Sequence, residues 1–434
     1  MSAECSAIDI PPGYKQTEVG VIPEDWKLTD LSSVCKEPMQ NGVFYKPSLK
    51  GVGIKLINVG DLYTQPPIDS DKLELFNASD KERERFKVED GDLFFTRSSV
   101  VPSGIAHCNI YRAPEPEPVV FDSHVIRLRP DIAKVVPLYL FRFCVATIAR
   151  HYLVSHAKTA TMTTIDQGVL GKCPVILPPI DEQESIAKAL SDTDALIESL
   201  EQLTAKKRQI KQGAMQELLT GKRRLPGFAT KAGYKRTEIG VIPKDWLDYT
   251  VGELIDFEGG SQPDKRTFIF TSKLGYVRLI QIRDYKTDKY ETYVPTSLAR
   301  RFCTKSDIMI GRYGPPIFQI LRGLSGAYNV ALIKAKPRPQ INLTYAYYFL
   351  KQDSLFEFID KLSQRSSGQT GVDLKELRNY PLSLPPTKDE QEAIATILSD
   401  MDSEITALEE KLAKARQIKQ GMMQELLTGR VRLI

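Results

Sequence analysis

The side chains of this 434-residue chain that could do chemistry are arginines, lysines and amides, and many of them directly follow short apolar runs. Such side chains donate hydrogen bonds to phosphates and to the edges of nucleic-acid bases. The chain has no G-x-x-x-x-G-K-[ST] phosphate loop, no Asn/Asp-Pro-Pro-Tyr/Phe methyltransferase signature and no C-x-x-C pair. We therefore expect no catalytic residue, no metal site and no cofactor in this chain.

The overall charge of the chain is nearly balanced. The 59 Lys+Arg residues against 55 Asp+Glu residues leave a formal net charge of +4, which excludes a polycation but permits local basic patches. The six cysteines are scattered and the four histidines form no metal-ligand spacing, which is typical of a protein from a reducing compartment. We see no membrane span and no secretory signal, so we expect a cytoplasmic protein.

The elements that must position these side chains are encoded twice. Residues 13–26 (GYKQTEVGVIPEDW) recur at 233–246 with eleven of fourteen positions identical, and 210–225 recurs at 418–433 with thirteen of sixteen identical. An LPP followed by an EQ-containing segment also recurs, from Leu177 and from Leu384. The repeats frame two divergent inserts, residues 27–176 and 247–383. A repeated frame around two different inserts predicts one scaffold that presents two different surfaces.

The two inserts are themselves related. Residues 55–61 align with 278–284, and residues 92–97 align with 307–312. Short β-branched runs bounded by Gly, Asp or Pro predict strands at 54–59, 93–96, 125–128, 276–282, 308–310 and 330–333. Helical spacing of apolar residues predicts one helix at 137–152 and another at 344–362. Each insert is therefore predicted to be an α+β domain.

The segment that follows each LPP is predicted to be a helix of about 40 residues. Apolar residues from Ile394 to Leu426 keep a heptad seam, and the first copy keeps a weaker seam that a parallel row of Leu196, Leu203 and Ile210 would supplement. Such helices must pair, so we expect an antiparallel pair with pseudo-two-fold symmetry. In an alternative arrangement, each helix packs only on its own domain. The equivalent Trp26 and Trp246 are expected to anchor the domains to the helices.

Together, the doubled GYKxTExGxIPxDW, LPPxxEQ and QELLTG blocks make the chain resemble type I restriction–modification specificity (S) subunits. The resemblance covers effectively the whole chain. It implies two homologous α/β target-recognition domains joined by two long antiparallel helices, at 13–179 (first domain), 180–220 (first helix), 221–236 (linker), 237–386 (second domain) and 387–429 (second helix).

The resemblance also implies a non-catalytic function. Each domain would read one half of a bipartite, asymmetric DNA site, and the helix pair would set the spacer and dock two modification subunits. S-adenosylmethionine, ATP and Mg²⁺ would belong to the modification and restriction subunits, not to this chain. Two alternatives from other classes are a coiled-coil protein adaptor and a nuclease or methyltransferase with unrecognised motifs.

The candidate DNA contacts are the donor side chains nearest the predicted strand ends. Arg97 and Arg312 lead, because they occupy equivalent positions directly after a strand, and Asn58 and Gln281 follow, because amides pair bidentately with adenine. In the first insert the candidates are Tyr45, Lys46, Lys50, Lys55, Asn58, Arg97, Ser98, Ser99, His107 and Lys158. In the second they are Gln262, Lys265, Arg266, Arg278, Gln281, Arg283, Tyr285, Lys286, Arg312, Tyr313 and Arg365.

Overall fold

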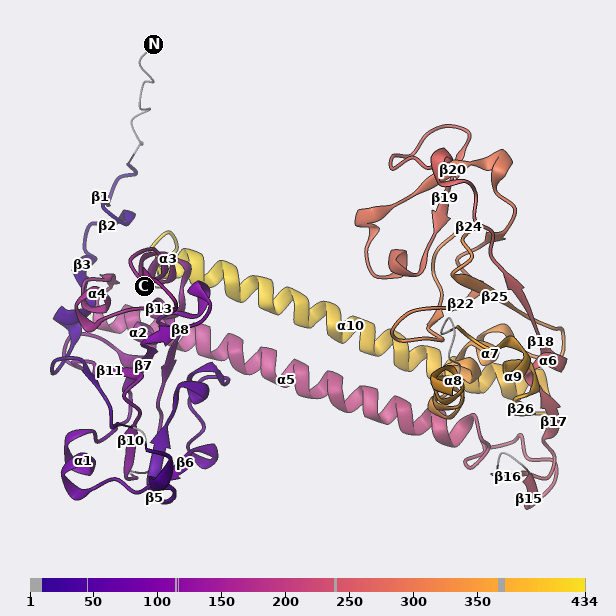
Figure 1. Cartoon of the computed structure of the whole chain (residues 1–434), viewed down its shortest axis with the longest axis horizontal. Helices are drawn as coiled ribbons and strands as arrows, with labels where there is room; N and C mark the ends of the chain where they lie inside the picture. The colour runs from indigo at the N-terminus through magenta and orange to yellow at the C-terminus, as the bar shows by residue number, and fades with distance from the viewer. Residues whose placement is uncertain are drawn as a thin grey trace, which may run out of the picture. The chain divides into compact units, whose positions relative to one another are not determined.

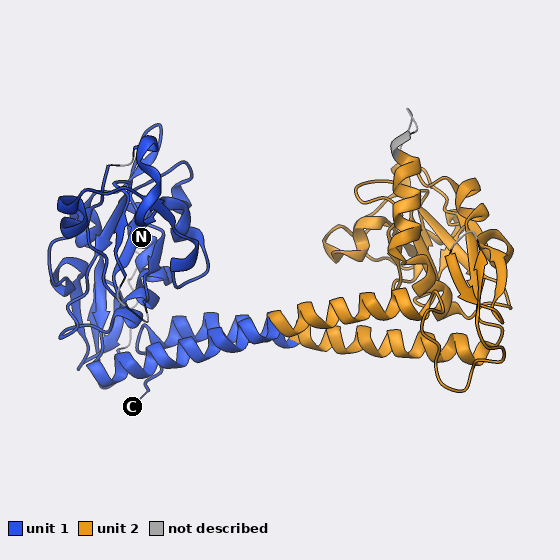
Figure 2. Ribbon diagram, turned by 90° about the horizontal axis from the view of Figure 1, so that it is seen from below, with its two compact units in different colours: residues 1–201, 411–434 blue, residues 202–410 orange. Residues whose placement is uncertain are grey.

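The computed structural model describes residues 10–44, 46–113, 115, 117–237, 240–365 and 371–433. The chain divides into two compact units, residues 1–201 with 411–434 and residues 202–410, which are shown in blue and orange in Figure 2. Each unit contains one insert and a part of both long helices, and each is described by itself below. None of the helices in the described residues is both long enough and apolar enough to cross a membrane.

The first unit is built on a four-stranded sheet whose strand order is β4-β11-β7-β9. Figure 1 labels its two central strands, β11 and β7. Smaller sheets flank it: the β1-β2 hairpin, the β3-β14 pair, β10-β5-β6 and β12-β13-β8. The strands are β1 Tyr14–Thr17, β2 Gly20–Pro23, β3 Lys27–Asp30, β4 Gln40–Asn41, β5 Lys50–Ile57, β6 Glu74–Phe76, β7 Leu93–Thr96, β8 Ser98–Ser99, β9 Cys108–Ile110, β10 Val119–Phe121, β11 Val125–Leu128, β12 Lys158–Thr159, β13 Thr163–Thr164 and β14 Pro174–Leu177. The helices of the insert are α1 Asp80–Arg85, α2 Pro137–Val145, α3 Thr147–Ser155 and α4 Gln167–Gly171.

The second unit has the equivalent central sheet, with strand order β18-β25-β22-β23. A hairpin, β15-β16, and a pair, β17-β26, again flank it, together with the sheet β20-β19-β24-β21. The strands are β15 Tyr234–Thr237, β16 Gly240–Pro243, β17 Leu247–Thr250, β18 Ile255–Gly259, β19 Tyr276–Ile280, β20 Tyr293–Pro295, β21 Phe302–Cys303, β22 Ile308–Gly311, β23 Ile320–Leu321, β24 Gly326–Tyr328, β25 Leu332–Pro337 and β26 Pro381–Leu384. The helices of the insert are α6 Val251–Leu254, α7 Leu343–Leu350, α8 Asp353–Arg365 and α9 Leu374–Asn379. The predicted α+β class and common fold are confirmed.

Each insert helix that the sequence predicts as one is two helices in the structure. The first breaks at Ala146, whose backbone is extended (φ −73°, ψ 157°) and whose N–H donates to Phe143 O at 3.0 Å. The second breaks between α7 and α8, at Lys351 and Gln352. Because apolar residues line the core on both sides of each break, their helical spacing does not reveal it.

The long helices, α5 (Ile180–Leu218) and α10 (Lys388–Leu426), are 39 residues each and pack antiparallel within both units. In the first unit Lys419 pairs with Asp194 at 2.5 Å, and Arg416 pairs with Glu201 at 2.6 Å. In the second, Lys207 pairs with Glu404 and Arg208 with Glu409, both at 2.6 Å. The predicted antiparallel pairing is confirmed, and the alternative in which each helix packs only on its own domain is wrong.

One detail of the predicted seam is wrong. Leu196, Leu203 and Ile210 are exposed on α5 and do not supplement the seam. Thr204 is buried instead, and Thr193 donates to Ala189 O at 2.8 Å within its own helix. A threonine whose hydroxyl bonds to the preceding turn can occupy an interhelical position, so the polar seam positions need no apolar substitute.

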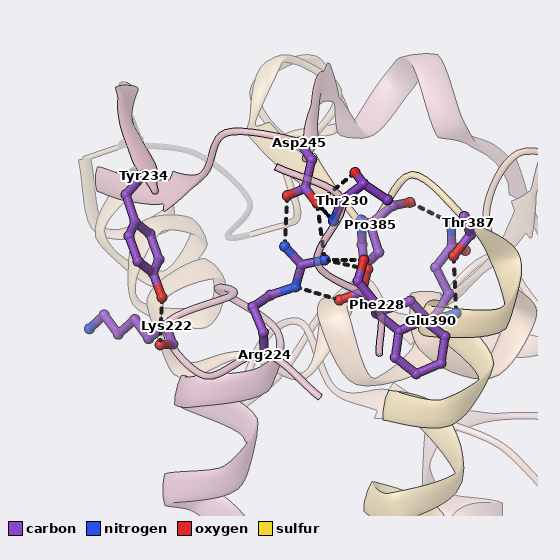
Figure 3. A network of polar contacts seen from close by, with 10 residues as sticks. Lys222, Arg224, Phe228, Thr230, Tyr234, Asp245, Pro385, Thr387 and Glu390 are labelled. Carbon is purple, nitrogen blue, oxygen red and sulfur yellow. Dashed lines mark hydrogen bonds and ion pairs between the residues drawn. The ribbon is translucent and has the colours of Figure 1, made fainter. Parts of the chain in front are cut away.

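In each unit one arginine, which lies over a tryptophan ring, bonds to a glutamate of a long helix and to the aspartate that precedes the tryptophan. We call this arrangement a clasp. In the second-unit clasp, Arg224 donates to Glu390 of α10 and to Asp245, at 2.7 and 2.6 Å (Figure 3). The Arg224 guanidinium lies over the ring of Trp246. In the first-unit clasp, Arg432 donates to Glu182 of α5 and to Asp25 over the ring of Trp26. Both tryptophans are buried, and Trp26 Nε1 donates to Glu182 at 3.0 Å. The tryptophans therefore anchor the domains to the helices as predicted.

Candidate nucleic-acid interface

Arg97 and Arg312 leave the central sheet at equivalent points of the two units. Arg97 follows β7, and its N–H donates to His124 O at 2.9 Å, just before β11 begins. Arg312 follows β22, and its N–H donates to Ala331 O at 2.8 Å, just before β25 begins. In each case the backbone of the arginine is held by a hydrogen bond to the connection that precedes the neighbouring strand. The point from which the arginine side chain extends is therefore fixed.

Arg97 lies in a pocket of about 390 Å³ that is lined by basic and hydroxyl side chains. The lining residues are Arg97, Ser98, His124, His156, Lys158, Thr164, Ile165, Asp166 and Val169. The Lys158 Nζ atom lies 3.6 Å from Asp166 Oδ2, and the His124 Nδ1 atom lies 2.9 Å from Asp122 Oδ1. The exposed Arg97 guanidinium has no ion-pair or hydrogen-bond partner among the described residues. It is therefore available to a phosphate or to the N7 and O6 acceptors of guanine.

The environment of Arg312 is different. Its guanidinium carbon lies 5.2 Å from the centre of the Tyr313 ring, and its Nε has no hydrogen-bond partner among the described residues. Tyr313 itself forms a β-bridge with Gly371. The cation is thus held against an aromatic face, which restricts its rotamers. Because the Nε atom is buried, an external acceptor would have to meet the terminal Nη groups.

Several other candidates are committed to ion pairs inside the protein. Lys50 bonds to Glu74 at 2.7 Å, and Lys55 to Glu117 at 2.5 Å. Arg278 is mostly buried and bonds to both Asp288 and Glu291 at 2.8 Å. Arg266 bonds to Asp264, two residues earlier, at 2.5 Å. These contacts reduce the donors that each side chain could offer to DNA.

Asn58 and Gln281 occupy the same structural position in the two domains. Each is the N-cap of a short 3₁₀ helix, Val59–Tyr63 or Ile282–Tyr285, and its N–H donates to the aspartate three residues on, Asp61 at 2.7 Å or Asp284 at 2.9 Å. Gln281 Nε2 also donates to Thr292 at 3.2 Å. The alignment of these residues therefore has a local structural cause, and their base-reading role stays a prediction.

The remaining candidates divide by exposure. Ser99 is buried, His107 stacks on Tyr63 with ring centroids 4.5 Å apart, and burial lowers the pKa of His107, which favours a neutral ring. Burial raises the pKa of Tyr285, whose hydroxyl has no partner among the described residues. The exposed candidates are Lys46, Lys158, Gln262, Lys265, Arg283 and Lys286. Tyr45 lies outside the described residues, as does the side chain of Arg365.

Sequence reasoning missed His124, His156 and Thr164, which share the Arg97 pocket. His124 lies 27 positions from Arg97 along the chain and reaches it through the β7-β11 pairing, in which Val125 is opposite Thr96. His156 and Thr164 come from the end of α3 and from β13, which pairs with β8. Only the sheet register brings these residues together, and no short motif encodes it.

Comparison with known proteins decides the family. The type I restriction modification DNA specificity domain matches this chain twice, over residues 23–211 and 243–419. The chain belongs to this family. Each match contains one insert and reaches into one long helix, so this specificity protein has two tandem recognition domains.

Relatives of this specificity protein extend over its full length. The putative type I restriction enzyme MjaX specificity subunit of Methanocaldococcus jannaschii is 26% identical over 441 residues, which cover 97% of each chain. The type I restriction enzyme MjaVIII specificity subunit of the same organism is 23% identical and covers 72% of this chain and 75% of its own. The type I restriction enzyme EcoKI specificity subunit of Escherichia coli is 26% identical over 41% of this chain and 38% of its own.

Solved structures share the fold. The S subunit of a type I restriction–modification system from M. genitalium has a TM-score of 0.57 at 14% identity, over 92% of this chain and 96% of that one. A chain from a study of complex assembly in a type I R-M system has a TM-score of 0.54 at 16% identity, over 94% of this chain and 99% of that one. At these identities the similarity concerns the fold alone.

Proposed function

We propose that this specificity protein reads a bipartite, asymmetric DNA sequence, with one half-site for each recognition domain. The observation that carries the proposal is the repeated arginine at the same strand end in two different environments. Arg97 lies free in a pocket with histidines, whereas Arg312 lies against a tyrosine ring. Equivalent positions with different neighbours fit two readers of one kind that select different bases.

The helix pair supports a spacer role. Both helices are 39 residues long, about 58 Å at the usual rise per residue. Interhelical ion pairs in each unit hold them together. We infer that this pair determines how many base pairs separate the two half-sites, and that the base pairs between them are not read.

Two equivalent grooves beside the helices support docking of two modification subunits. In the second unit a groove of about 530 Å³ is lined by Arg208, Lys211, Gln212, Met215 and Gln216 of α5. In the first unit a groove of about 680 Å³ is lined by the residues 208 positions later on α10, which are Arg416, Lys419, Gln420, Met423 and Gln424. All five residue types are identical in the two grooves.

The basic residues of the two grooves also serve the helix pair, because Arg208 and Arg416 form equivalent interhelical ion pairs with Glu409 and Glu201. The exposed Gln216 and Gln424 have no such role, so packing does not require their identity. The same surface presented twice suits two copies of one partner. The modification subunits would supply S-adenosylmethionine and methylate adenine, and restriction subunits joining the complex would supply the ATP- and Mg²⁺-dependent activities.

The test is genome-wide mapping of methylated adenine in cells with and without this gene. We expect one split, non-palindromic motif to vanish on deletion and to return on complementation. An unchanged methylation map would contradict the proposal. Stable assembly with a modification subunit without any sequence preference in DNA binding would favour the adaptor alternative instead.

A further inference from the structure

Each recognition domain exposes a phenylalanine in the same strand connection. Phe44 lies between β4 and β5 and is 78% exposed, and Phe270 lies between β18 and β19 and is 73% exposed. These connections are equivalent, because β4 and β18 are the edge strands next to β11 and β25 in the two central sheets. An aromatic side chain so exposed in both copies of a domain is a surface feature that folding does not require.

The first residues of each connection pack closely against the segment that joins β10 to β11 or β24 to β25. The same segment accepts the backbone hydrogen bond of Arg97 or Arg312. A Cβ on Gly42 would lie 1.7 Å from Phe121 O, and a Cβ on Gly260 would lie 1.9 Å from Asn329 O. Only glycine permits this approach. Both loops therefore leave the sheet beside the connection to which Arg97 or Arg312 is bonded. Phe44 follows Gly42 by two residues, whereas Phe270 follows Gly260 by ten and lies next to the Ile269–Tyr293 pair.

The backbone also presents each phenylalanine in a defined direction. Val43 is buried, its N–H donates to Phe121 O at 2.7 Å, and its carbonyl accepts from Ser123 at 2.8 Å. Ile269 exchanges two hydrogen bonds with Tyr293, at 3.0 and 2.8 Å. In extended backbone, successive side chains point to opposite sides, so the residue after each of these points outward.

Basic residues flank the two side chains in sequence, and of these Lys50 and Arg266 are paired with Glu74 and Asp264. Residues 42–50 contain two lysines and no acidic residue. Residues 260–275 contain two lysines and one arginine against a single aspartate, and Lys46, Lys265 and Lys273 are exposed. An apolar wedge flanked by cations is complementary to a stacked, negatively charged duplex and less so to a neutral protein surface.

We propose that Phe44 and Phe270 insert against the base stack, one in each half-site, and partly unstack one base step there. The proposal rests on the DNA-reading function proposed above. A wedge of this kind makes recognition depend on how easily a step unstacks, so pyrimidine–purine steps at the contact favour binding. The wedges add a sequence preference that needs no hydrogen bond to a base.

The experiment uses the specificity protein assembled with its modification subunits, without S-adenosylmethionine, and duplexes that contain the mapped motif. 2-Aminopurine replaces one base at a time through both half-sites, leaving out the methylated adenines. We expect fluorescence to rise on binding at one step in each half-site. Phe44→Ala should abolish the rise in one half-site only, Phe270→Ala should abolish it in the other, and each should weaken binding by about 5- to 150-fold.

Matched controls separate insertion from general damage. Ile132 is 77% exposed in the first unit and follows the opposite end of β11, and Phe356 is an exposed phenylalanine on α8 of the second unit. Ile132→Ala and Phe356→Ala should retain both fluorescence signals, as should the conservative Phe44→Trp. Signals that persist in Phe44→Ala and Phe270→Ala, or that are lost equally in the controls, overturn the proposal.

The two proposals fail in different ways. A complex that binds motif and scrambled duplexes equally would overturn the reading function, and the wedges with it. A complex that prefers the motif but gives no fluorescence rise at any step would overturn the wedges alone.

Discussion

The second-unit clasp should be worth more free energy than the first-unit clasp. Arg224 contacts two carboxylates that are almost fully buried, since the side chains of Asp245 and Glu390 are 3% and 1% exposed. Arg224→Ala would leave both without a countercharge, and stranding buried carboxylates costs about 3–5 kcal/mol of unfolding free energy. Arg432 contacts one buried carboxylate, Glu182, and Asp25, which is 53% exposed.

The free energy of unfolding should therefore fall by only about 2 kcal/mol in Arg432→Ala. Asp25 can be solvated there, and Glu182 keeps the hydrogen bond from Trp26 Nε1. Urea unfolding followed by tryptophan fluorescence measures both losses. The chain has two tryptophans, one under each clasp, so a Trp26→Phe background reports on the second unit and a Trp246→Phe background on the first.

The pH dependence gives a second check. Burial alone raises the pKa of Asp245, yet hydrogen bonds from Arg224 and Thr230 hold that pKa well below its usual range. Its contribution to stability is thus present at neutral pH and is lost only as the pH falls through the lowered pKa. Burial raises the pKa of Glu390, which Arg224 offsets only in part.

Without Arg224, burial would raise the pKa of Glu390 further above that of the unfolded chain, and the pKa of Asp245, which would keep only the Thr230 hydrogen bonds, would also rise. The folded variant would then bind protons more readily than the unfolded variant. The difference in unfolding free energy between the unsubstituted protein and Arg224→Ala should therefore be smaller at pH 5 than at pH 7.5. A loss in Arg432→Ala as large as in Arg224→Ala, or a deficit in Arg224→Ala that does not change with pH, would refute this reasoning.

Three further predictions concern DNA reading. Arg97→Ala should cost about 1–3 kcal/mol of discrimination in one half-site, and Arg312→Ala the same in the other, as measured by competition with duplexes altered in one half; equal weakening on every sequence would instead identify a phosphate contact. Replacing residues 27–176 by a second copy of 247–383 should convert the methylated motif into a palindrome, which methylation mapping reads directly, and an unchanged motif would contradict the assignment of one half-site to each domain. Adding seven residues to both α5 and α10 beside the Glu201–Arg416 ion pair should lengthen the spacer by about three base pairs, since seven residues rise about 10.5 Å; a motif with the original spacing would mean that the helices do not set it.

The sequence is sufficient to predict the frame of this protein because the frame is repeated. Two copies of one helix, each with an apolar seam, have few ways to bury those seams. The structure extends α5 over Ile180–Leu218 where the pattern indicates 181–220. The strands 93–96 and 125–128 are also found as predicted, since both are short, apolar and bounded by turn residues.

Side-chain partners could not be predicted in the same way. Nothing local indicates that Lys55 bonds to Glu117, 62 residues later, or that His124 shares a pocket with Arg97. Asn58 and Gln281 are predicted to read bases because amides pair bidentately with adenine, and that prediction does not reveal that both residues also cap a turn. Spacing in sequence determines periodic faces, but sheet register and ion pairing depend on contacts between distant segments.

The two ends of each insert lie next to each other. In the first unit β3 pairs with β14, so that Lys27 is opposite Leu177, and in the second β17 pairs with β26, so that Leu247 is opposite Leu384. A foreign segment can replace an insert if its ends form the same short ladder and if it keeps the contacts with the long helices, such as those of Arg142 with Asp194 and of Tyr348 with Asp402. Because near-identical amino-acid blocks precede both inserts (13–26 and 233–246) and follow both (210–225 and 418–433), recombination at these blocks could exchange a whole recognition domain in one event. A cell could thereby acquire a new methylation pattern without the many single substitutions that would otherwise be needed.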